Sequence, residues 1–221
     1  MMRRIYYPLF ADLAGRRCLV VGGGAIAQRK ALQLLQCEAA VAVISPTVTR
    51  RLAALAKAGR VRLMKRDFSP ADLRGVWLVI AATNDQRINE AVARAASSKR
   101  IFANIVDQPS LCSFIAPAIV RRSGITVAVS TGGASPSIAK RIRTEVGYLL
   151  ARRYAPLLRL AAALRPVAKR KLPTYQDRKR YFDHLLNSPI AKRAGKGRHG
   201  EARRQALALL ERAANGHQRT D

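Results

Sequence analysis

Residues 17–35 read RCLVVGGGAIAQRKALQLL, so that a short apolar run passes through three glycines into a helix-like pattern. The run before the glycines is typical of a buried strand, and the apolar positions after it recur at the spacing of one helix face. Gly22, Gly24 and Ala27 fit the Gly-x-Gly-x-x-Gly/Ala pattern at the junction of the two elements. A strand, a glycine turn and a helix in this order predict a nucleotide-binding α/β domain.

The alternation of strand and helix continues along the first half of the chain. The apolar run at residues 77–82 has no interruption, as expected for a strand that is covered on both faces. Such repetition predicts a parallel, doubly wound sheet of the Rossmann type. Its expected members are the strands 17–21, 41–44, 61–64, 77–82 and 101–106 and the helices 27–37, 49–58 and 85–97.

The pattern changes after residue 112. Residues 113–120 and 125–130 are apolar runs on either side of a short basic turn, which indicates an antiparallel pair. Ser135 and Pro136 then have the residue types that begin a helix, and the remaining chain is mostly helical in pattern. The sequence therefore predicts three parts, over residues 1–112, 113–150 and 151–221.

The glycine turn has the chemistry of a pyrophosphate site. Gly22 tolerates backbone angles that other residues avoid, and a side chain at Gly24 would block the anion. The helix N-terminus near Ala25 and Ile26 offers free N–H groups and a partial positive charge. We therefore predict that these residues, with Gly23 between them, hold a nucleotide cofactor.

The choice between NAD and NADP stays open on spacing alone. NAD sites usually carry Asp or Glu about 20 residues after the turn, but this chain has Ser45, Pro46 and Thr47 there. Ser45 and Thr47 can still hydrogen-bond a ribose. The nearby Arg50 and Arg51 suit a 2′-phosphate instead.

Composition narrows the class of protein. The formal net charge of +28 over 221 residues is compatible with an anionic substrate, with nucleic acid, or with an arginine-rich solvated surface. No apolar run is long enough for a bilayer and no signal peptide is recognisable, so we expect a cytoplasmic protein without membrane contact. The three cysteines and three histidines have neither disulfide nor metal-ligand spacing, and no bound metal is predicted.

Six segments, in this order and spacing, resemble the dehydrogenase and ferrochelatase module of siroheme synthase, which also occurs as a free-standing precorrin-2 dehydrogenase. The resemblance covers about residues 5–155, and the rest matches only in length and helical character. The segments are 7–13 (YPLFADL), 20–31 (VVGGGAIAQRKA), 80–85 (IAATND), 104–109 (NIVDQP), 113–117 (SFIAP) and 127–136 (VAVSTGGASP).

The resemblance implies a specific enzyme activity. Members of this family oxidise precorrin-2 to sirohydrochlorin with NAD+, and some also insert Fe2+ as a lyase to give siroheme, with iron as substrate rather than bound cofactor. They are homodimers. The three predicted parts would then be a Rossmann NAD-binding domain, a dimerisation region over residues 113–150 and a basic helical C-terminal region.

The resemblance also implies site residues. Asp107 follows a predicted strand at the edge where doubly wound sheets bind ligands, and it matches the family's acid–base residue. The predicted cofactor-binding residues are Gly22, Gly23, Gly24, Ala25, Ile26, Ser45, Pro46, Thr47, Ala82 and Thr83. The predicted substrate-binding residues also form one set. Ser130 is expected to position the macrocycle, and Gly132 and Gly133 lead into a helix N-terminus that can bind a carboxylate. Lys140, Arg141 and Arg143 are the predicted contacts to the other carboxylates of the tetrapyrrole.

Three other functions remain open on the sequence. A Rossmann module that senses a nucleotide without catalysis would not need Asp107. An NADP-linked reductase of another small metabolite would use Arg50 and Arg51. A nucleic-acid-binding protein would explain the charge, but the sequence has no identifiable recognition helix or aromatic stacking platform, which disfavours it.

Overall fold

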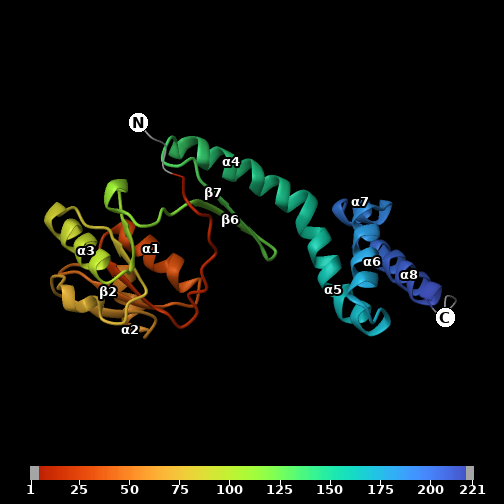
Figure 1. Cartoon of the computed structure of the whole chain (residues 1–221), viewed down its shortest axis with the longest axis horizontal. Helices are drawn as coiled ribbons and strands as arrows, with labels where there is room; N and C mark the ends of the chain where they lie inside the picture. The colour runs from red at the N-terminus through yellow and green to blue at the C-terminus, as the bar shows by residue number, and fades with distance from the viewer. Residues whose placement is uncertain (1–4, 218–221) are drawn as a thin grey trace. The chain divides into compact units, whose positions relative to one another are not determined.

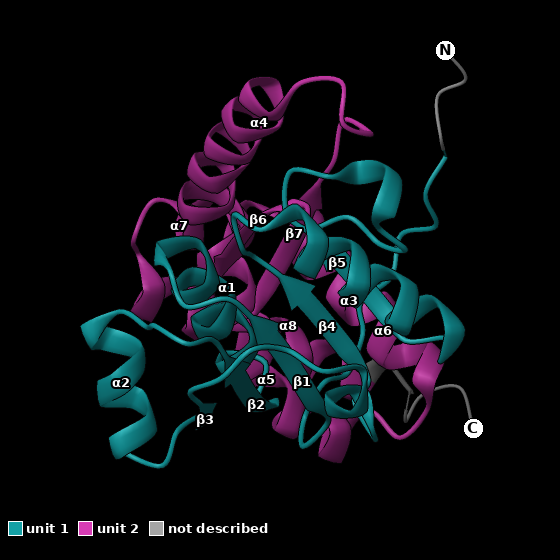
Figure 2. Cartoon of the chain, turned by 90° about the vertical axis from the view of Figure 1, so that its left-hand side faces the viewer, with its two compact units in different colours: residues 1–116 teal, residues 117–221 magenta. Residues whose placement is uncertain are grey.

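The computed structural model describes residues 5–217. The chain divides into two compact units, Met1–Ala116 and Pro117–Asp221 (Figure 2). Each unit has its own buried core and is described by itself.

The first unit is built on a five-stranded parallel sheet with the order β3-β2-β1-β4-β5. The strand order reverses between β1 and β4, which are hydrogen-bonded neighbours, and such a switch point is where doubly wound sheets bind ligands. The predicted α/β fold is confirmed. The strands are β1 (Arg17–Val21), β2 (Ala40–Ile44), β3 (Arg62–Met64), β4 (Leu78–Ala81) and β5 (Phe102–Ile105).

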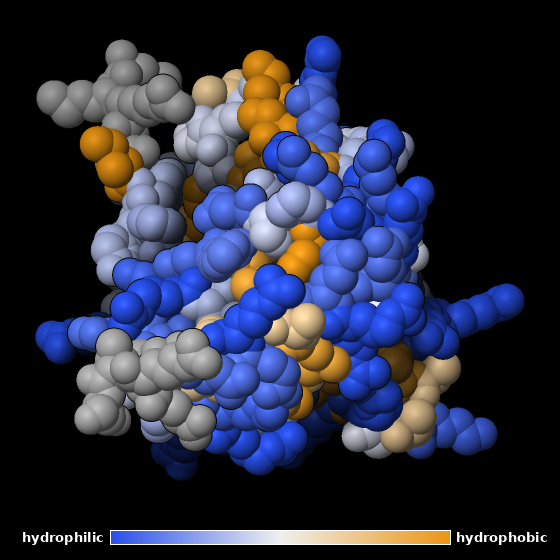
Figure 3. All heavy atoms as spheres, turned by 90° about the vertical axis from the view of Figure 1, so that its right-hand side faces the viewer, coloured by the Kyte–Doolittle hydropathy of each residue, from blue (hydrophilic) through white to orange (hydrophobic). Residues whose placement is uncertain are grey.

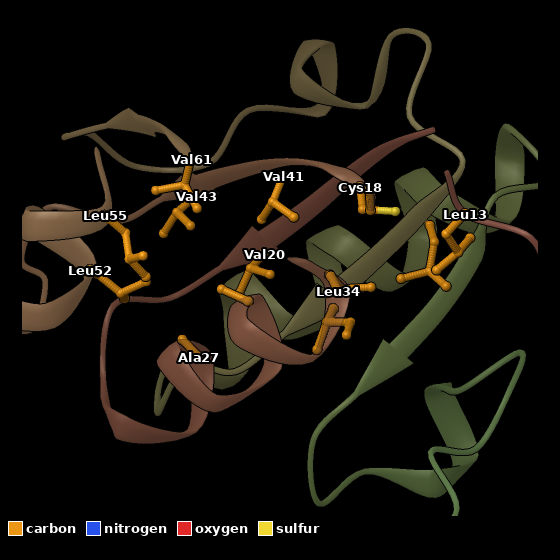
Figure 4. Close-up of a cluster of buried hydrophobic side chains, with 14 residues drawn as sticks. Leu13, Cys18, Val20, Ala27, Leu34, Val41, Val43, Leu52, Leu55 and Val61 are labelled. Carbon is orange, nitrogen blue, oxygen red and sulfur yellow. The ribbon is translucent and has the colours of Figure 1, made fainter. Parts of the chain in front are cut away.

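Helices cover both faces of this sheet (Figure 1). In β1, Cys18 and Val20 pack with α1 and α2 in one cluster, part of which Figure 4 shows, while Leu19 and Val21 pack with α3 in the other. This alternation follows from the two-residue period of a strand. The helical elements are α1 (Ala25–Leu35), α2 (Arg50–Lys57), α3 (Gln86–Ser98) and the 3₁₀ turns η1 (Pro70–Leu73) and η2 (Pro109–Leu111).

The second unit begins with the predicted antiparallel pair, β6 (Ala118–Arg122) and β7 (Ile125–Val129). Helix α4 (Pro136–Leu149) follows and packs against both strands. A π-helical turn, η3 (Leu150–Tyr154), joins it to α5 (Ala155–Lys171), so the helix does not end near residue 153 as expected. A helical bundle completes the unit with α6 (Tyr175–Asn187), α7 (Pro189–Gly195) and α8 (His199–His217).

The bundle has a small apolar core and a hydrophilic outside. Leu164, Leu185 and Leu210 come from three different helices and are almost completely buried. On the face shown in Figure 3, hydrophilic side chains predominate and hydrophobic ones gather in separate patches. Among residues 5–217, every helix is too short or too polar to span a bilayer.

The thiol of Cys18 predicts a pH dependence of stability. Burial, with a smaller contribution from Cys37, raises the pKa of Cys18 from 9.0 to about 11. The folded state therefore keeps a proton that the unfolded state releases, so this contribution to stability is complete below pH 9 and is lost as the pH rises toward 11. We expect the free energy of unfolding of the wild type to fall, relative to that of Cys18→Ala, by on the order of 1–2 kcal/mol across this pH range.

Urea unfolding at pH 8 and at pH 10.5 measures this difference. Cys37→Ala is the control, because it removes the half-exposed thiol and keeps the buried one. A Cys18→Ala variant that follows the wild type at both pH values would contradict the prediction.

Candidate active site

The glycine turn joins β1 to α1 at the carboxyl edge of the sheet. Helix α1 begins at Ala25, two residues earlier than expected, because the N–H of Gln28 donates to the carbonyl of Gly24 at 2.9 Å. Gly24 is the N-cap residue and provides no side-chain hydrogen bond to the first turn. Gly24, Ala25 and Ile26 are all exposed. The first turn of α1 therefore presents N–H groups that a ligand can reach.

The three glycines meet very different surroundings. Gly22 has a φ of +118°, and a Cβ there would lie 2.3 Å from the carbonyl oxygen of Ala82. A Cβ at Gly23 would lie 1.8 Å from the carbonyl oxygen of Thr47. A Cβ at Gly24 would meet nothing within 4 Å. The first two glycines are therefore needed for packing, whereas the third faces open space.

The turn brings together most of the predicted cofactor residues. Ser45 and Thr47 approach Gly23, and their loop is tied to the turn because the N–H of Thr49 donates to the carbonyl of Gly23 at 2.9 Å. Ala82 and Thr83 approach Gly22 from the end of β4. Pro46 lies between Ser45 and Thr47 and is exposed.

Two side chains that fix this arrangement were not among the predicted site residues. Asn89 is buried in α3, and its amide donates to the carbonyl of Thr83 at 3.1 Å. The hydroxyl of Thr49 donates to the side-chain oxygen of Gln28 at 2.7 Å, which connects α2 to α1. In the sequence, Asn89 is a polar residue on an otherwise apolar helix face, and this could have indicated a buried side chain with a hydrogen-bond partner.

Asp107 lies just beyond β5, at the same edge of the sheet. The N–H of Val106 donates to the carbonyl of Ala81 at 2.9 Å, so the chain stays paired with β4 up to the residue before Asp107. The Asp107 side chain is exposed, and its φ is +60°. A non-glycine residue in this left-handed conformation costs about 1–2 kcal/mol, and such outliers gather at functional sites.

Lys30 is a further charged group of this site that the sequence did not single out. Burial lowers the pKa of Lys30, as does Arg29, while the charges of Cys112 and Asp107 raise it. The half-buried Lys30 of α1 is therefore within electrostatic range of Asp107. In the sequence, only the position of Lys30 among Ala27, Ala31 and Leu34 of the buried helix face indicated that this lysine is partly buried.

The second unit holds the residues predicted to bind tetrapyrrole carboxylates. After β7, the hydroxyl of Ser130 accepts a hydrogen bond from the N–H of Gly132 at 3.1 Å. Gly132 and Gly133 both have positive φ, at +63° and +87°. Ser135 caps α4, with its hydroxyl accepting from the N–H of Ile138 at 3.2 Å. This compact turn leads directly into the N-terminus of α4.

The basic residues of α4 are not equally available. Lys140 and Arg141 are exposed, and Arg143 is half-buried. The Nε of Arg141 lies 3.0 Å from Oε1 of Glu145, so its charge is already partly compensated. The turn before α4 and these three residues belong to one unit, whereas the glycine turn and Asp107 belong to the other.

A nicotinamide dinucleotide fits the residues of the first unit. The open space at Gly24 and the uncapped first turn of α1 suit a pyrophosphate, and the hydroxyl of Ser45 and the main chain of Thr47 lie beside Gly23. Among residues 5–217, no three His, Cys, Asp or Glu side chains gather as metal ligands would.

Comparison with known families agrees with this description. Residues 9–118 match a family model for NAD(P)-binding domains, and residues 153–210 match the model of the sirohaem synthase dimerisation region. The second match falls within the predicted C-terminal region and outside residues 113–150, where the sequence suggested a dimerisation region. The NAD(P) model does not distinguish the two nicotinamide cofactors.

Individual relatives point the same way. The siroheme synthase of Methylococcus capsulatus is 42% identical over 209 residues, which are 95% of this chain and 44% of that protein. That of Pseudomonas entomophila is 41% identical over 208 residues, 94% of this chain and 45% of that protein. The chain therefore spans less than half the length of these curated relatives.

A solved structure matches nearly the whole chain. The precorrin-2 dehydrogenase SirC superposes with a TM-score of 0.78 at 26% identity, over 94% of this chain and 100% of that one. The resemblance read from the six sequence segments is confirmed. The chain belongs to the family that contains the precorrin-2 dehydrogenase SirC and the siroheme synthases.

Proposed function

We propose that the chain oxidises precorrin-2 to sirohydrochlorin with NAD+. The observation that carries this proposal is the exposed carboxylate of Asp107 at the same sheet edge as the glycine turn, one strand beyond the residues that contact the turn. The family relationship supplies the substrate, because SirC is named as a precorrin-2 dehydrogenase. A nucleotide sensor would have no need for a carboxylate at this position.

In this proposal the predicted residues contact different parts of the cofactor. Gly24, Ala25 and Ile26 bind the pyrophosphate through main-chain N–H groups, and Ser45 and Thr47 bind a ribose. Pro46 shapes the same loop, while Gly22 and Gly23 allow the loops to approach, and Ala82 and Thr83 line the side nearer β4. NAD+ is the proposed cofactor because the resemblance to the family implies it.

The oxidation removes a hydride and a proton from the macrocycle. A nicotinamide held at the glycine turn would supply the hydride acceptor. Asp107 accepts the proton, for which its carboxylate must be ionised and reachable, and the side chain is exposed.

Iron insertion is a second activity that the same carboxylate supports. Placing Fe2+ into sirohydrochlorin requires removal of pyrrole protons, and an exposed Asp107 can accept them. Iron enters this reaction as a substrate, and the product is siroheme. Dehydrogenation remains the primary proposal, since it uses both the glycine turn and Asp107.

A homodimer is the proposed assembly. Ile138, Ile142 and Leu149 of α4 are exposed apolar residues at helical spacing, a pattern that suits contact with a second chain. The residue ranges 1–112, 113–150 and 151–221 are retained as the proposed cofactor, central and C-terminal parts, and a cytoplasmic location is proposed with them.

The basic side chains of α4 are proposed to attract the carboxylates of the substrate, together with Ser130, Gly132 and Gly133. We expect Arg141→Ala/Arg143→Ala to raise the KM for precorrin-2 by about threefold to tenfold with little change in kcat, because charges at the surface mainly affect encounter and binding. Lys140 remains in this variant, so part of the attraction persists.

Steady-state kinetics at two salt concentrations measure this effect. The variant should also show a weaker dependence of KM on salt than the wild type. Arg203→Ala/Arg204→Ala, which removes the same charge from α8, is the control. Equal KM values and equal salt dependence in all three proteins would show that Arg141 and Arg143 do not contribute to substrate binding.

The decisive experiment is anaerobic incubation of the chain with precorrin-2 and NAD+, followed by the absorbance of sirohydrochlorin. Parallel reactions contain NADP+ instead of NAD+, or added Fe2+. We expect oxidation with NAD+, and siroheme only where iron is present. Folded protein that binds NAD+ but forms no sirohydrochlorin would refute the proposal and favour a sensing role.

A further inference from the structure

A cavity of about 500 Å³ is lined by residues of β1, β2 and β3 and of the loops beside them, from Arg17 at the start of β1 to Met64 at the end of β3. Neither the proposed reaction nor the family comparison accounts for it. None of the predicted cofactor-binding residues lines it, and the lining residue of β1 nearest the glycine turn is Leu19, three residues before Gly22 and therefore about 10 Å away at 3.3 Å per residue. The cavity is therefore separate from the proposed nucleotide site.

The walls of this cavity are strongly basic. Five of the residues that line it are arginines, and the only acidic one is Asp72. Asp72 is already neutralised, because both of its carboxylate oxygens accept hydrogen bonds from Arg66, at 2.8 and 2.5 Å. Those hydrogen bonds also hold the pKa of Asp72 below its ordinary value.

Four guanidinium groups remain without an acidic counterpart. None of them forms an ion pair with any residue in the part of the chain that the structure describes. These groups belong to Arg17, Arg60, Arg62 and Arg74. Four like charges around one hollow repel one another, and a bound anion would relieve that repulsion.

Local structure keeps part of this wall in place. The guanidinium of Arg17 lies against the main chain of Gly75, where a Cβ would be only 3.2 Å from its Nη1. The hydrogen bond from the N–H of Ser69 to Asp72, at 2.8 Å, fixes the turn that carries Asp72 and hence Arg66. These contacts connect one side of the cavity to η1 and the residues after it.

We propose that this cavity binds a small oligoanion that carries several carboxylate or phosphate groups. Guanidinium groups bind both kinds of oxygen anion in a bidentate manner. A volume of about 500 Å³ falls within the usual range of small-molecule sites. The lining contains no aromatic side chain on which a nucleobase could stack, which favours a small anion over a nucleic acid.

The single tryptophan of the chain provides a reporter. Trp77 follows the lining residue Val76, and its ring lies 5.0 Å from the guanidinium carbon of Arg16. Inorganic tripolyphosphate and propane-1,2,3-tricarboxylate are titrated separately at constant ionic strength, with Trp77 fluorescence and equilibrium dialysis as readouts. Saturable binding of the first probe alone, the second alone or both identifies phosphate, carboxylate or either as the recognised group.

The variant Arg17→Gln/Arg62→Gln tests the location. We expect it to weaken binding of the effective probe by about tenfold or more, because two charge-assisted contacts are lost. Lys179→Gln/Arg203→Gln removes two exposed charges from the helical bundle and should bind the probe like the wild type. Thermal melts of all variants establish that they are folded.

A saturating concentration of NAD+ separates this proposal from the nucleotide site. We expect the probe to bind equally well with NAD+ present, and Arg17→Gln/Arg62→Gln to bind NAD+ normally. The proposal is overturned by the absence of saturable binding of either probe, by equal weakening in both double variants, or by competition with NAD+. It does not depend on whether precorrin-2 is oxidised.

Discussion

Asp107→Asn is expected to abolish the oxidation of precorrin-2 while leaving NAD+ binding unchanged. Asparagine has the same shape and also tolerates the left-handed conformation that Asp107 adopts, with φ at +60°. It lacks only the ability to take up a proton at this position. Removal of a general base typically lowers the rate by about 10²- to 10⁴-fold.

The measurement is a single-turnover assay under anaerobic conditions, with NAD+ affinity determined separately by calorimetry. Asp107→Gly is an informative second variant. Glycine relieves the left-handed strain, so we expect the free energy of unfolding to stay equal or rise by up to about 1 kcal/mol while turnover is still lost. An Asn variant that retains more than about a tenth of the wild-type rate would exclude Asp107 as the base.

Much of the first unit could be predicted from the sequence, because the patterns that indicate its strands, turn and helices each lie in adjacent residues. An apolar strand, a glycine turn and a helix are adjacent in the chain, and each following strand shows the same continuous apolar character. Both ends of each of the five strands lie within one residue of the expected positions. Asp107 was recognisable in the same way, as an acid directly after a strand.

The remaining features depend on residues that are far apart in the chain. The electrostatic interaction of Lys30 with Asp107 and the hydrogen bond between Thr49 and Gln28 require the folded sheet. The basic cavity was even harder to predict from the sequence, because its arginines come from separate strands and loops. In the sequence those arginines were part of a general positive charge with no assigned position.

The backbone angle of Asp107 also lies beyond sequence reasoning. A positive φ is usual for glycine and tolerable for asparagine, but nothing in the sequence distinguishes this aspartate from one in an ordinary turn. The angle follows from the tight connection after β5, where the N–H of Gln108 donates to the carbonyl of Ile105 at 3.2 Å. That connection holds the carboxylate at the sheet edge, where the proposed chemistry needs it.

The second large effect is expected from Gly24→Ala, which should weaken NAD+ binding by at least about 100-fold without unfolding the protein. The φ of Gly24 is −77°, an angle that alanine adopts readily, and a Cβ there meets no protein atom within 4 Å. Alanine is a weaker N-cap residue, so the free energy of unfolding should fall by no more than about 1 kcal/mol. The added methyl group instead occupies the space that the pyrophosphate requires.

Gly23→Ala is the matched comparison, since it adds the same methyl group one residue earlier. There the Cβ would lie 1.8 Å from the carbonyl oxygen of Thr47, and main-chain atoms cannot move aside cheaply. We expect a loss of at least about 3 kcal/mol of stability, with NAD+ binding lost together with the fold. Thermal melts and calorimetry on both variants separate the two roles, because a turn that only supports the fold would leave Gly24→Ala with normal NAD+ affinity. Three consecutive glycines that look equivalent in the sequence would thus divide into two that are required by the packing of loops and one that is required by the ligand.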